Sequence, residues 1–183
     1  MKAWQHFKTI THHKLLVMQG CFRVGLYRQG LTHDLSKYSP TEFRVGAKYY
    51  QGDRSPNSAE RADIGYSTAW MHHKGRNKHH YEYWTDLDLT TGRYESRPMP
   101  RNYLAEMVMD RRAACMTYQG ANYTDASPWE YFAGSRERSL MHPELERQLS
   151  FLLQMLRDQG ENETFHYIKF HVLRGDPFPW ETK

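Results

Sequence analysis

Apolar residues along this chain recur mainly at spacings of three and four, which predict amphipathic helices rather than strands. The first predicted helix covers residues 3–29, and the glycines at 20, 25 and 30 weaken its far end. Near the other end of the chain, a leucine-rich helix is predicted from Pro143 to Gly160 and a shorter one over 163–172. Because helix signals dominate throughout, the pattern indicates an all-α fold.

Capping residues and helix breakers set the bounds of the helices between these two ends. The Ser-Pro-Thr-Glu motif at 39–42 is a capping box that starts a helix ending near Tyr50. After a loop at 51–57, Asn57 or Ser58 is predicted to cap a helix that ends near Lys74. Gly75 is its expected C-cap.

The segment 76–99 is rich in aromatic and turn residues and predicts a small hairpin around 89–94. A further helix covers 100–119, and a second capping box lies at 127–130. We therefore expect one domain over residues 1–183, built as a bundle of six or seven helices with one elaborated loop.

The composition argues against several classes of protein, among them DNA-binding and membrane-spanning proteins. The net charge of +4 is too weak to indicate a DNA-binding surface, and no apolar run is long enough to span a membrane. The first residues lack the apolar region of a signal peptide, and two cysteines give no disulfide framework, so a cytoplasmic location is expected. Aromatic residues, at 14%, must supply much of the core.

Histidine is the residue type that stands out, with 11 copies in 183 residues. His33-Asp34 offers an imidazole nitrogen and a carboxylate oxygen to one metal ion, or one group to each of two ions. Lys37 follows His33 by four residues, so on a helix its ammonium group faces the same way and lies where a phosphate would bind.

Other candidate ligands precede and follow this pair. Helical periodicity does not choose between His12 and His13, but His13 lies with Gly20, which would let the helix carrying His33 approach, and we prefer it. The remaining candidates are His73 (or its neighbour His72), His79, His80 and Asp110, with Glu106 one turn before Asp110 as a partner for the ligands.

Each residue has an ordinary explanation when taken alone. A histidine on an apolar face is usually a core residue, the cluster at 72–80 could be a solvated basic turn, and Asp110 could pair with Arg111 or Arg112. Together, however, the order His, His-Asp, His, His-His, Asp on successive helices is what a one- or two-metal site in a helical bundle requires.

The order His13, His33-Asp34, Asp110 resembles the HD-domain superfamily of helical, metal-dependent phosphohydrolases. The stretch 33–37 is similar to an element of its cyclic-dinucleotide phosphodiesterase branch, although no Gly-Tyr-Pro motif follows the paired histidines. The stretches 12–43, 69–84 and 99–114 are similar to an HD-like family of bacterial and phage proteins.

This resemblance implies a hydrolase that holds one or two divalent ions. The first ion would bind His13, His33, Asp34 and Asp110, and a second would bind His73, His79 and His80 with Asp34 as the bridge. Mixed nitrogen and carboxylate ligands suit Mn, Fe, Co, Ni or Zn better than Mg.

We expect a phosphomonoesterase or phosphodiesterase acting on a nucleotide or another small phosphorylated metabolite. The expected catalytic residues are Asp34 with Lys37 and Arg76, whose positive charges would neutralise the phosphate. One alternative is an HD-like di-iron oxygenase. The other is a non-enzymatic metal- or nucleotide-binding module, in which exposed aromatic groups stack on a ligand (Tyr81, Tyr83, Trp84 and Trp129). The sequence is compatible with a homo-oligomer.

Overall fold

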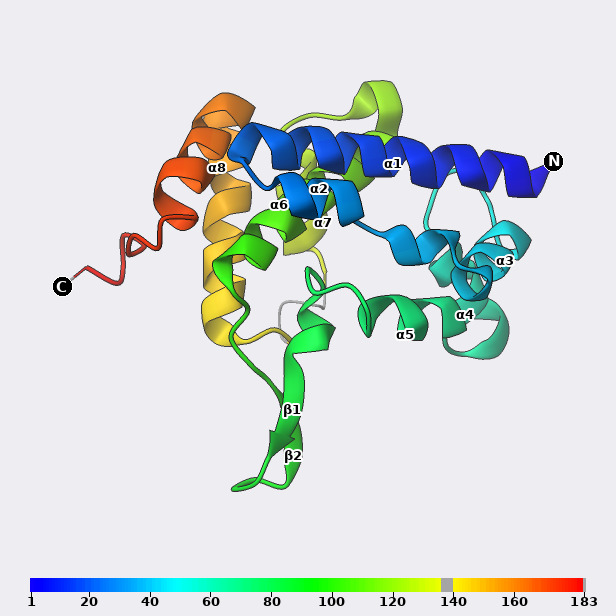
Figure 1. Ribbon diagram of the computed structural model, residues 1–183, viewed down its shortest axis with the longest axis horizontal. Helices are drawn as coiled ribbons and strands as arrows, with labels where there is room; N and C mark the ends of the chain where they lie inside the picture. The colour runs from blue at the N-terminus through cyan, green and yellow to red at the C-terminus, as the bar shows by residue number, and fades with distance from the viewer. Residues whose placement is uncertain (136–139, 183) are drawn as a thin grey trace.

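The computed structural model describes residues 1–135 and 140–182, and their fold is all-α apart from one small hairpin (Figure 1). The elements in chain order are α1 (Lys2–Val24), α2 (Tyr27–Thr32), η1 (Leu35–Tyr38), α3 (Pro40–Lys48), α4 (Pro56–Ile64), α5 (Thr68–Lys74), η2 (Tyr81–Trp84), β1 (Thr85–Asp88), β2 (Arg93–Ser96), α6 (Arg101–Gln119), η3 (Gly120–Asn122), α7 (Ser127–Ala133), α8 (Pro143–Tyr167) and η5 (Ile168–Val172). The predicted fold class is therefore confirmed, with eight α-helices in the described part of the chain instead of six or seven.

The centre of the bundle is the pair α1 and α6, which pack along each other. Helix α2 lies against α1, α3 packs between α1 and α5, and α8 crosses the far end of the pair (Figure 1). The core is filled by aliphatic residues, methionines and aromatics, among them Val17, Leu104, Met109, Phe132, Leu149, Leu152 and Phe178. None of the described helices is both long and apolar enough to cross a membrane.

The prediction of one helix over 3–29 is wrong, and the break matters for the site. Gly25 adopts a left-handed conformation with φ 88°, and its N–H bonds back to the carbonyls of Cys21 and Phe22. The chain then reverses into α2. In an unbroken helix, His33 would lie about 30 Å along the axis from His13. The reversal instead brings their ring centroids to 5.7 Å.

The predicted helix ending at Lys74 is also two helices. Helix α4 starts earlier than expected, because the hydroxyl of Ser55, not Asn57 or Ser58, accepts the first backbone N–H. It ends at Gly65, which has φ 84°, and Ser67 caps α5 by accepting the N–H of Trp70. This corner lets α5 turn back and carry its C-terminal histidines toward the centre of the bundle (Figure 1).

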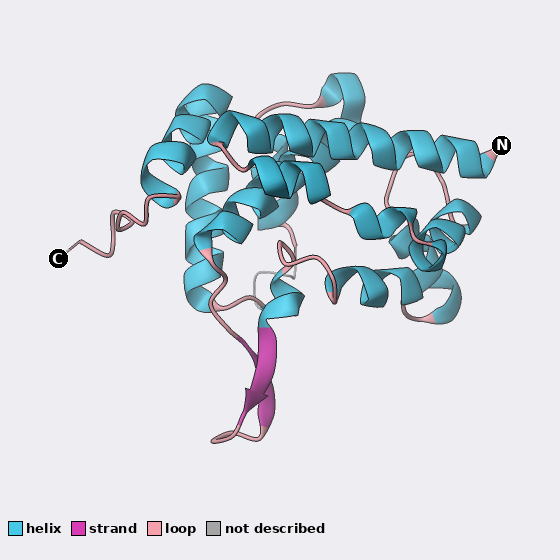
Figure 2. Cartoon of the chain, viewed as in Figure 1, coloured by secondary structure: helices cyan, strands magenta, loops and turns pink. Residues whose placement is uncertain are grey.

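Other predicted boundaries hold, with two changes. The hairpin is confirmed, pairs Leu87 with Tyr94, and projects away from the bundle (Figure 2). The predicted helix end at Gly160 is a kink with φ 79° and ψ 178° inside α8. Ser127 does start α7, but it does not cap it, because its hydroxyl accepts the N–H of Thr124 instead.

Candidate metal centre

Asp34 lies at the centre of the site in an unusual backbone conformation. With φ 53° and ψ 25°, it is the one non-glycine residue with positive φ among residues 1–135 and 140–182. Aspartate adopts this left-handed region more readily than most residues, at a cost of about 1–2 kcal/mol. The turn ends α2, starts η1 and places the carboxylate inside the bundle, where the residue is only 2% exposed.

The Oδ2 atom of Asp34 faces residues from α1, the end of α2 and α6. It lies 3.7 Å from Nε2 of His13 and 3.3 Å from Nε2 of His33. The same two nitrogens lie 3.0 Å and 3.4 Å from Oδ1 of Asp110. These four residues, which we call the His13 group, therefore offer two nitrogens and two oxygens to one point in space.

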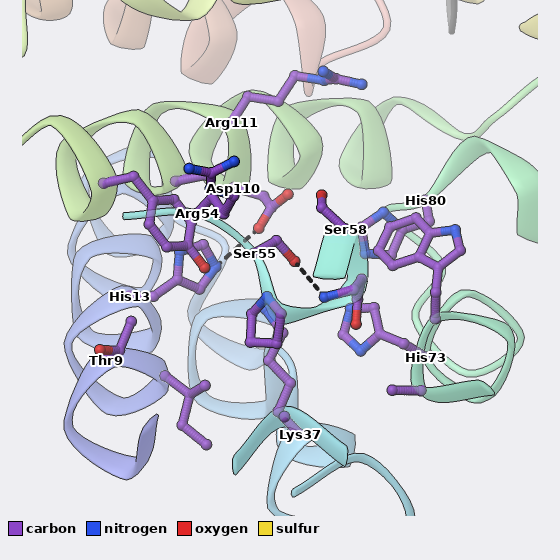
Figure 3. A pocket seen from close by; sticks show the side chains of 18 of the residues that line it. Thr9, His13, Lys37, Arg54, Ser55, Ser58, His73, His80, Asp110 and Arg111 are labelled. Atoms are coloured by element: carbon purple, nitrogen blue, oxygen red, sulfur yellow. Dashed lines mark hydrogen bonds and ion pairs between the residues drawn. The ribbon is translucent and has the colours of Figure 1, made fainter. Parts of the chain in front are cut away.

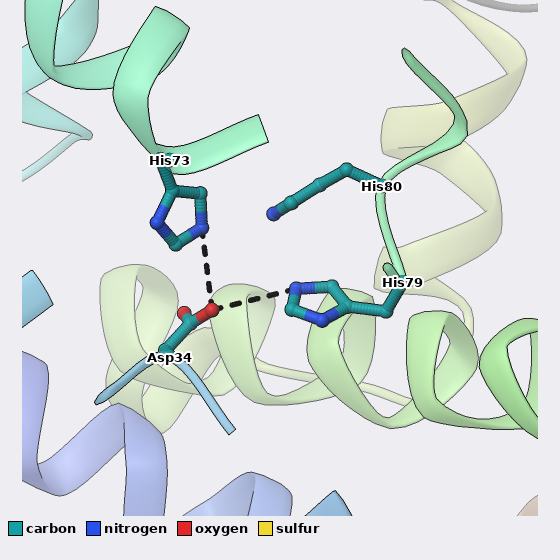
Figure 4. Close-up of side chains that lie close together, drawn as sticks. All are labelled: Asp34, His73, His79 and His80. Carbon is teal, nitrogen blue, oxygen red and sulfur yellow. Dashed lines mark ion pairs between the residues drawn. The ribbon is translucent and has the colours of Figure 1, made fainter. Parts of the chain in front are cut away.

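The Oδ1 atom of Asp34 faces a different set, which comes from the end of α5 and the loop after it (Figure 4). It lies 3.2 Å from Nε2 of His73 and 3.4 Å from Nε2 of His79. His80 completes this cluster, which we call the His73 group. Asp34 is the one residue common to both groups, with one oxygen turned to each.

Two buried glutamates contact the Nδ1 atoms of the ligand histidines, the ring nitrogens that do not face Asp34. Oε1 of Glu106 lies 2.8 Å from Nδ1 of His33 and 3.1 Å from Nδ1 of His79. Oε2 of Glu42 lies 2.8 Å from Nδ1 of His73. A carboxylate at Nδ1 keeps the proton there and leaves the Nε2 lone pair free for a metal. Sequence reasoning anticipated Glu106 but read Glu42 only as a capping residue.

The unpaired atoms of the site test whether it fits a metal ion. Burying such polar atoms without a partner costs about 1–3 kcal/mol each. Within the described part of the chain, several of the inward-facing atoms are buried without a hydrogen bond of good geometry: His33 Nε2, His79 Nε2, His80 Nε2 and both carboxylate oxygens of Asp34, of which Oδ2 also forms an ion pair with Lys37. These nitrogen and oxygen atoms are metal-ligand atoms that converge, so the donor set fits one or two divalent transition metals.

The electrostatic environment keeps several of these groups in the forms that bind metal. Burial alone would raise the pKa of Asp34, but His33, Lys37 and His73 hold it well below the usual range. Burial, together with His79 and His73, lowers the pKa of His80 well below its usual value. A carboxylate that is ionised and an imidazole that is neutral are the protonation states a metal requires.

The neighbouring imidazoles respond to the same carboxylates. Burial lowers the pKa of His33, but the charge of Asp34 and the carboxylates of Asp34, Asp110 and Glu106, which accept from the imidazolium ring, raise it well above its usual value. The pKa of His73 rises for similar reasons. The acidic groups therefore favour positive charge at the centre of the site, which is the charge a metal ion supplies.

Of the two predicted phosphate-binding cations, only Lys37 reaches the site. It does so from the 3₁₀ turn η1 rather than from an α-helix shared with His33, and its Nζ lies 2.5 Å from Oδ2 of Asp34. Burial opposes its charge, but Asp34 and Asp110 raise the pKa of Lys37. The expectation for Arg76 is wrong, because its exposed guanidinium bonds to the carbonyl of His72 and does not line the pocket.

A cavity of about 670 Å³ opens on the two groups, and Figure 3 shows His13, His73, His80 and Asp110 pointing toward it. This volume is typical of small-molecule sites. Its wall carries four cationic side chains, of which the sequence indicated only the first: Lys37, Arg54, Arg61 and Arg111. The wall also carries the carboxylates of Glu42, Asp53, Glu82 and Asp110, and Asp53 forms an ion pair with Arg54. Arg54 lay in a predicted loop, and Arg111 was read as a partner for Asp110, so neither carried a signal of this role.

Comparison with known protein families identifies the family of this chain. The sequence profile of DUF5662, described as a family of unknown function, matches residues 2–155. The chain belongs to this family. No curated protein and no solved structure matches the chain significantly. The matched DUF5662 region contains both ligand groups, both glutamates and the four cavity cations.

The structure of this DUF5662 protein also shows that, in the first two pairs of adjacent histidines along the chain, only one histidine faces the metal-ligand groups. His13 is 6% exposed and faces Asp34 and Asp110, whereas His12 is on the exposed side of α1. The reason offered from Gly20 is wrong, since a Cβ there would meet Met109 of α6, not the segment carrying His33. His73 faces Asp34, while Nδ1 of His72 contacts Oε1 of Glu42.

The aromatic residues considered as exposed stacking groups lie mostly in the packed interior. Tyr81 is 8% exposed, and Trp84 and Trp129 pack against the core. Of the four, only Tyr83 is largely exposed, at 37%. These four residues therefore do not together form an exposed platform for stacking on a nucleotide.

Proposed function

We propose that this DUF5662 protein is a metal-dependent phosphohydrolase that acts on a nucleotide or another small phosphorylated metabolite. One observation carries the proposal. The two oxygens of Asp34 face two separate sets of ligands, one of histidines with Asp110 and one of histidines alone, and members of both sets border a cavity that Lys37 also lines. This arrangement supports two ions, with Asp34 as the bridge between them.

Bound divalent ions would supply hydroxide near neutral pH, by lowering the pKa of water, and would neutralise charge on the phosphate oxygens. The protein must then hold and orient the phosphate. Lys37 carries its charge at the edge of the His13 group, where it contacts Asp34, and Arg111 is the next residue of α6 after Asp110 (Figure 3). Cations placed in this way stabilise the charge of a phosphoryl group in the transition state.

The position of the charged Lys37 side chain favours phosphate chemistry over the oxygenase alternative. Asp34 holds Lys37 next to the ligands. The carboxylates of Asp34 and Asp110, which face the first metal site, raise the pKa of Lys37 and so stabilise its charged form despite burial. Dioxygen carries no charge that would require an ammonium group there, whereas an anionic substrate does. The similarity of residues 33–37 to the phosphodiesterase branch of the HD-domain superfamily supports the same conclusion.

Substitution of Lys37 tests the phosphohydrolase proposal directly. Lys37→Met should keep the metal content, because a charged lysine is not a ligand, and should lower kcat/KM on the best substrate of a phosphoester panel by about 100-fold or more. Lys8→Met, at an exposed position on α1, is the matched control and should retain full activity.

The assay is hydrolysis of phosphomonoesters and phosphodiesters by protein that contains the metal with which it purifies. A metal-loaded protein that hydrolyses no phosphoester, or a Lys37→Met variant with unchanged turnover, contradicts the proposal. An iron-loaded protein that consumes dioxygen and leaves phosphoesters intact would favour the oxygenase.

A further inference from the structure

The glutamates that support the ligand histidines are not shared evenly between the two metal groups. Glu42, on α3, contacts His73 of the His73 group, and its other oxygen contacts His72, which is in neither group. Glu106, on α6, contacts one histidine from each group: His33 of the His13 group and His79 of the His73 group. The same oxygen atom, Oε1, makes both contacts.

We propose that Glu106 is a positioning residue for both metal sites at once, whereas Glu42 positions ligands of the His73 group alone. This inference rests on the proposed function, because it assumes that the two groups hold metal ions. It predicts that the loss of the Glu106 carboxylate weakens metal binding at both sites, whereas the loss of the Glu42 carboxylate weakens binding at one.

The packing around Glu106 explains how one carboxylate can serve two rings. The residue is 5% exposed and lies one helical turn before Asp110, so a single stretch of α6 carries both a ligand and the group that orients two others. The rings of His33 and His79 lie against each other, with centroids 4.4 Å apart. Their Nδ1 atoms therefore converge on Glu106, while both Nε2 atoms turn toward Asp34.

The ring orientations of His33 and His79 depend on Glu106 more than the orientation of a histidine within a helix would. His33 follows the last residue of α2, and His79 lies in the loop between α5 and η2. His73, by contrast, is within α5. A loop backbone restrains a side chain less than a helix does, so the ring orientations at 33 and 79 rest on contacts such as the one with Glu106.

The test is metal retention measured against a chelator, which does not depend on catalytic activity. The wild-type protein, loaded with Zn²⁺ and dialysed against graded chelator concentrations, should hold two ions per chain before release begins. Glu42→Gln should lose one ion at a lower chelator concentration and keep the other at the wild-type concentration. Glu106→Gln should lose both ions at chelator concentrations at least about 10-fold lower.

Glutamine matches the size of glutamate, and Glu163→Gln, at an exposed position of α8, is the matched control and should behave as the wild type. Far-UV circular dichroism of each variant shows whether the helices remain, and Glu106→Asp, which restores the charge, should recover part of the affinity. The inference is overturned if Glu106→Gln keeps one ion at the wild-type affinity, or if Glu42→Gln weakens both.

The same measurement separates this inference from the proposed function. A wild-type chain that binds no Zn²⁺ overturns both, and a chain that binds only one ion overturns the role of Glu106 at two sites. Two ions that are held equally well by wild type and Glu106→Gln overturn only the role of Glu106. Two ions held as predicted in a protein without phosphoesterase activity overturn the phosphohydrolase and leave the role of Glu106 standing.

Discussion

At the scale of single residues, one aspartate organises the site. Asp34 accepts a left-handed backbone so that its two oxygens can face two sets of ligands, and strain of this kind is typical of functional positions. The cost is offset only if those contacts stabilise the protein, which a metal ion bound to both sets would do.

One buried histidine outside the ligand groups, His6, should make the stability of the protein depend on pH. His6 is 5% exposed, packs against Phe43 and Tyr50, and has its ring against the backbone of Gly46. Burial, with a smaller contribution from Lys37, lowers the pKa of His6 to about 4. The folded protein therefore favours neutral His6 and disfavours its protonated form.

The sign of the effect follows from this pKa. Stability from neutral His6 is complete above the unfolded pKa of 6.5 and falls as the pH drops toward 4, by at most about 3 kcal/mol. His6→Gln removes the titration, so its free energy of unfolding, measured in urea with chelator present, should vary less with pH between 6.5 and 4 than that of the wild type. Equal pH dependence of the two proteins would contradict a neutral, buried His6.

Residue types were the most predictable part of the site. His13, His33, Asp34 and Asp110 could be proposed from sequence because few side chains ligate metals and their order along the helices is restrictive. Glu42 could not, because a carboxylate at this point in a capping motif has a complete local explanation. Arg76 was misplaced because its position depends on the path of a turn, which sequence periodicity does not describe.

At the scale of elements, glycine breaks decide which residues meet. Gly25 and Gly65 both end helices in left-handed conformations, and each break turns a following element back toward the site. The sequence pattern did not predict either end, because glycine inside a helix costs only about 1 kcal/mol and does not by itself require a stop. The start of α3 was predicted correctly, since Ser39 and Pro40 have a specific role at a helix start, whereas the caps predicted at Asn57 or Ser58 and at Ser127 were not found.

Replacement of Gly25 measures the energetic requirement of the first reversal. Gly25→Ala should lower the free energy of unfolding by about 1–2 kcal/mol, because a Cβ is unfavourable at φ 88° although no atom lies within 4 Å of it. The expected fall in Tm is about 2–8 °C.

Gly75→Ala is the control, since Gly75 has an ordinary φ of −75° and room for a methyl group. Its Tm should stay within about 1 °C of the wild type or rise slightly. If Gly25→Ala were as stable as Gly75→Ala, the left-handed turn after α1 would not be required.

At the scale of the whole molecule, the site exists only through long-range packing. The ligands come from α1, from the turn after α2, from the end of α5 and the loop after it, and from α6. The reversal of the chain between α1 and α2 is what brings His13 to His33. The sequence predicted the helices and most ligands, but not which helices are neighbours or where the cavity lies. The positions of Arg54 and Arg111 in the cavity wall could therefore be recognised only from the fold.

The central claim is that the two histidine–aspartate groups bind metal ions, and elemental analysis of His13→Ala and His12→Ala tests it most directly. The two residues are adjacent on α1, but only His13 faces Asp34 and Asp110. Wild type and His12→Ala, purified without added metal, should carry the same transition metal at up to two ions per chain, whereas His13→Ala should carry at least one ion fewer. Metal-free wild-type protein, or equal metal content in the two variants, would contradict the account.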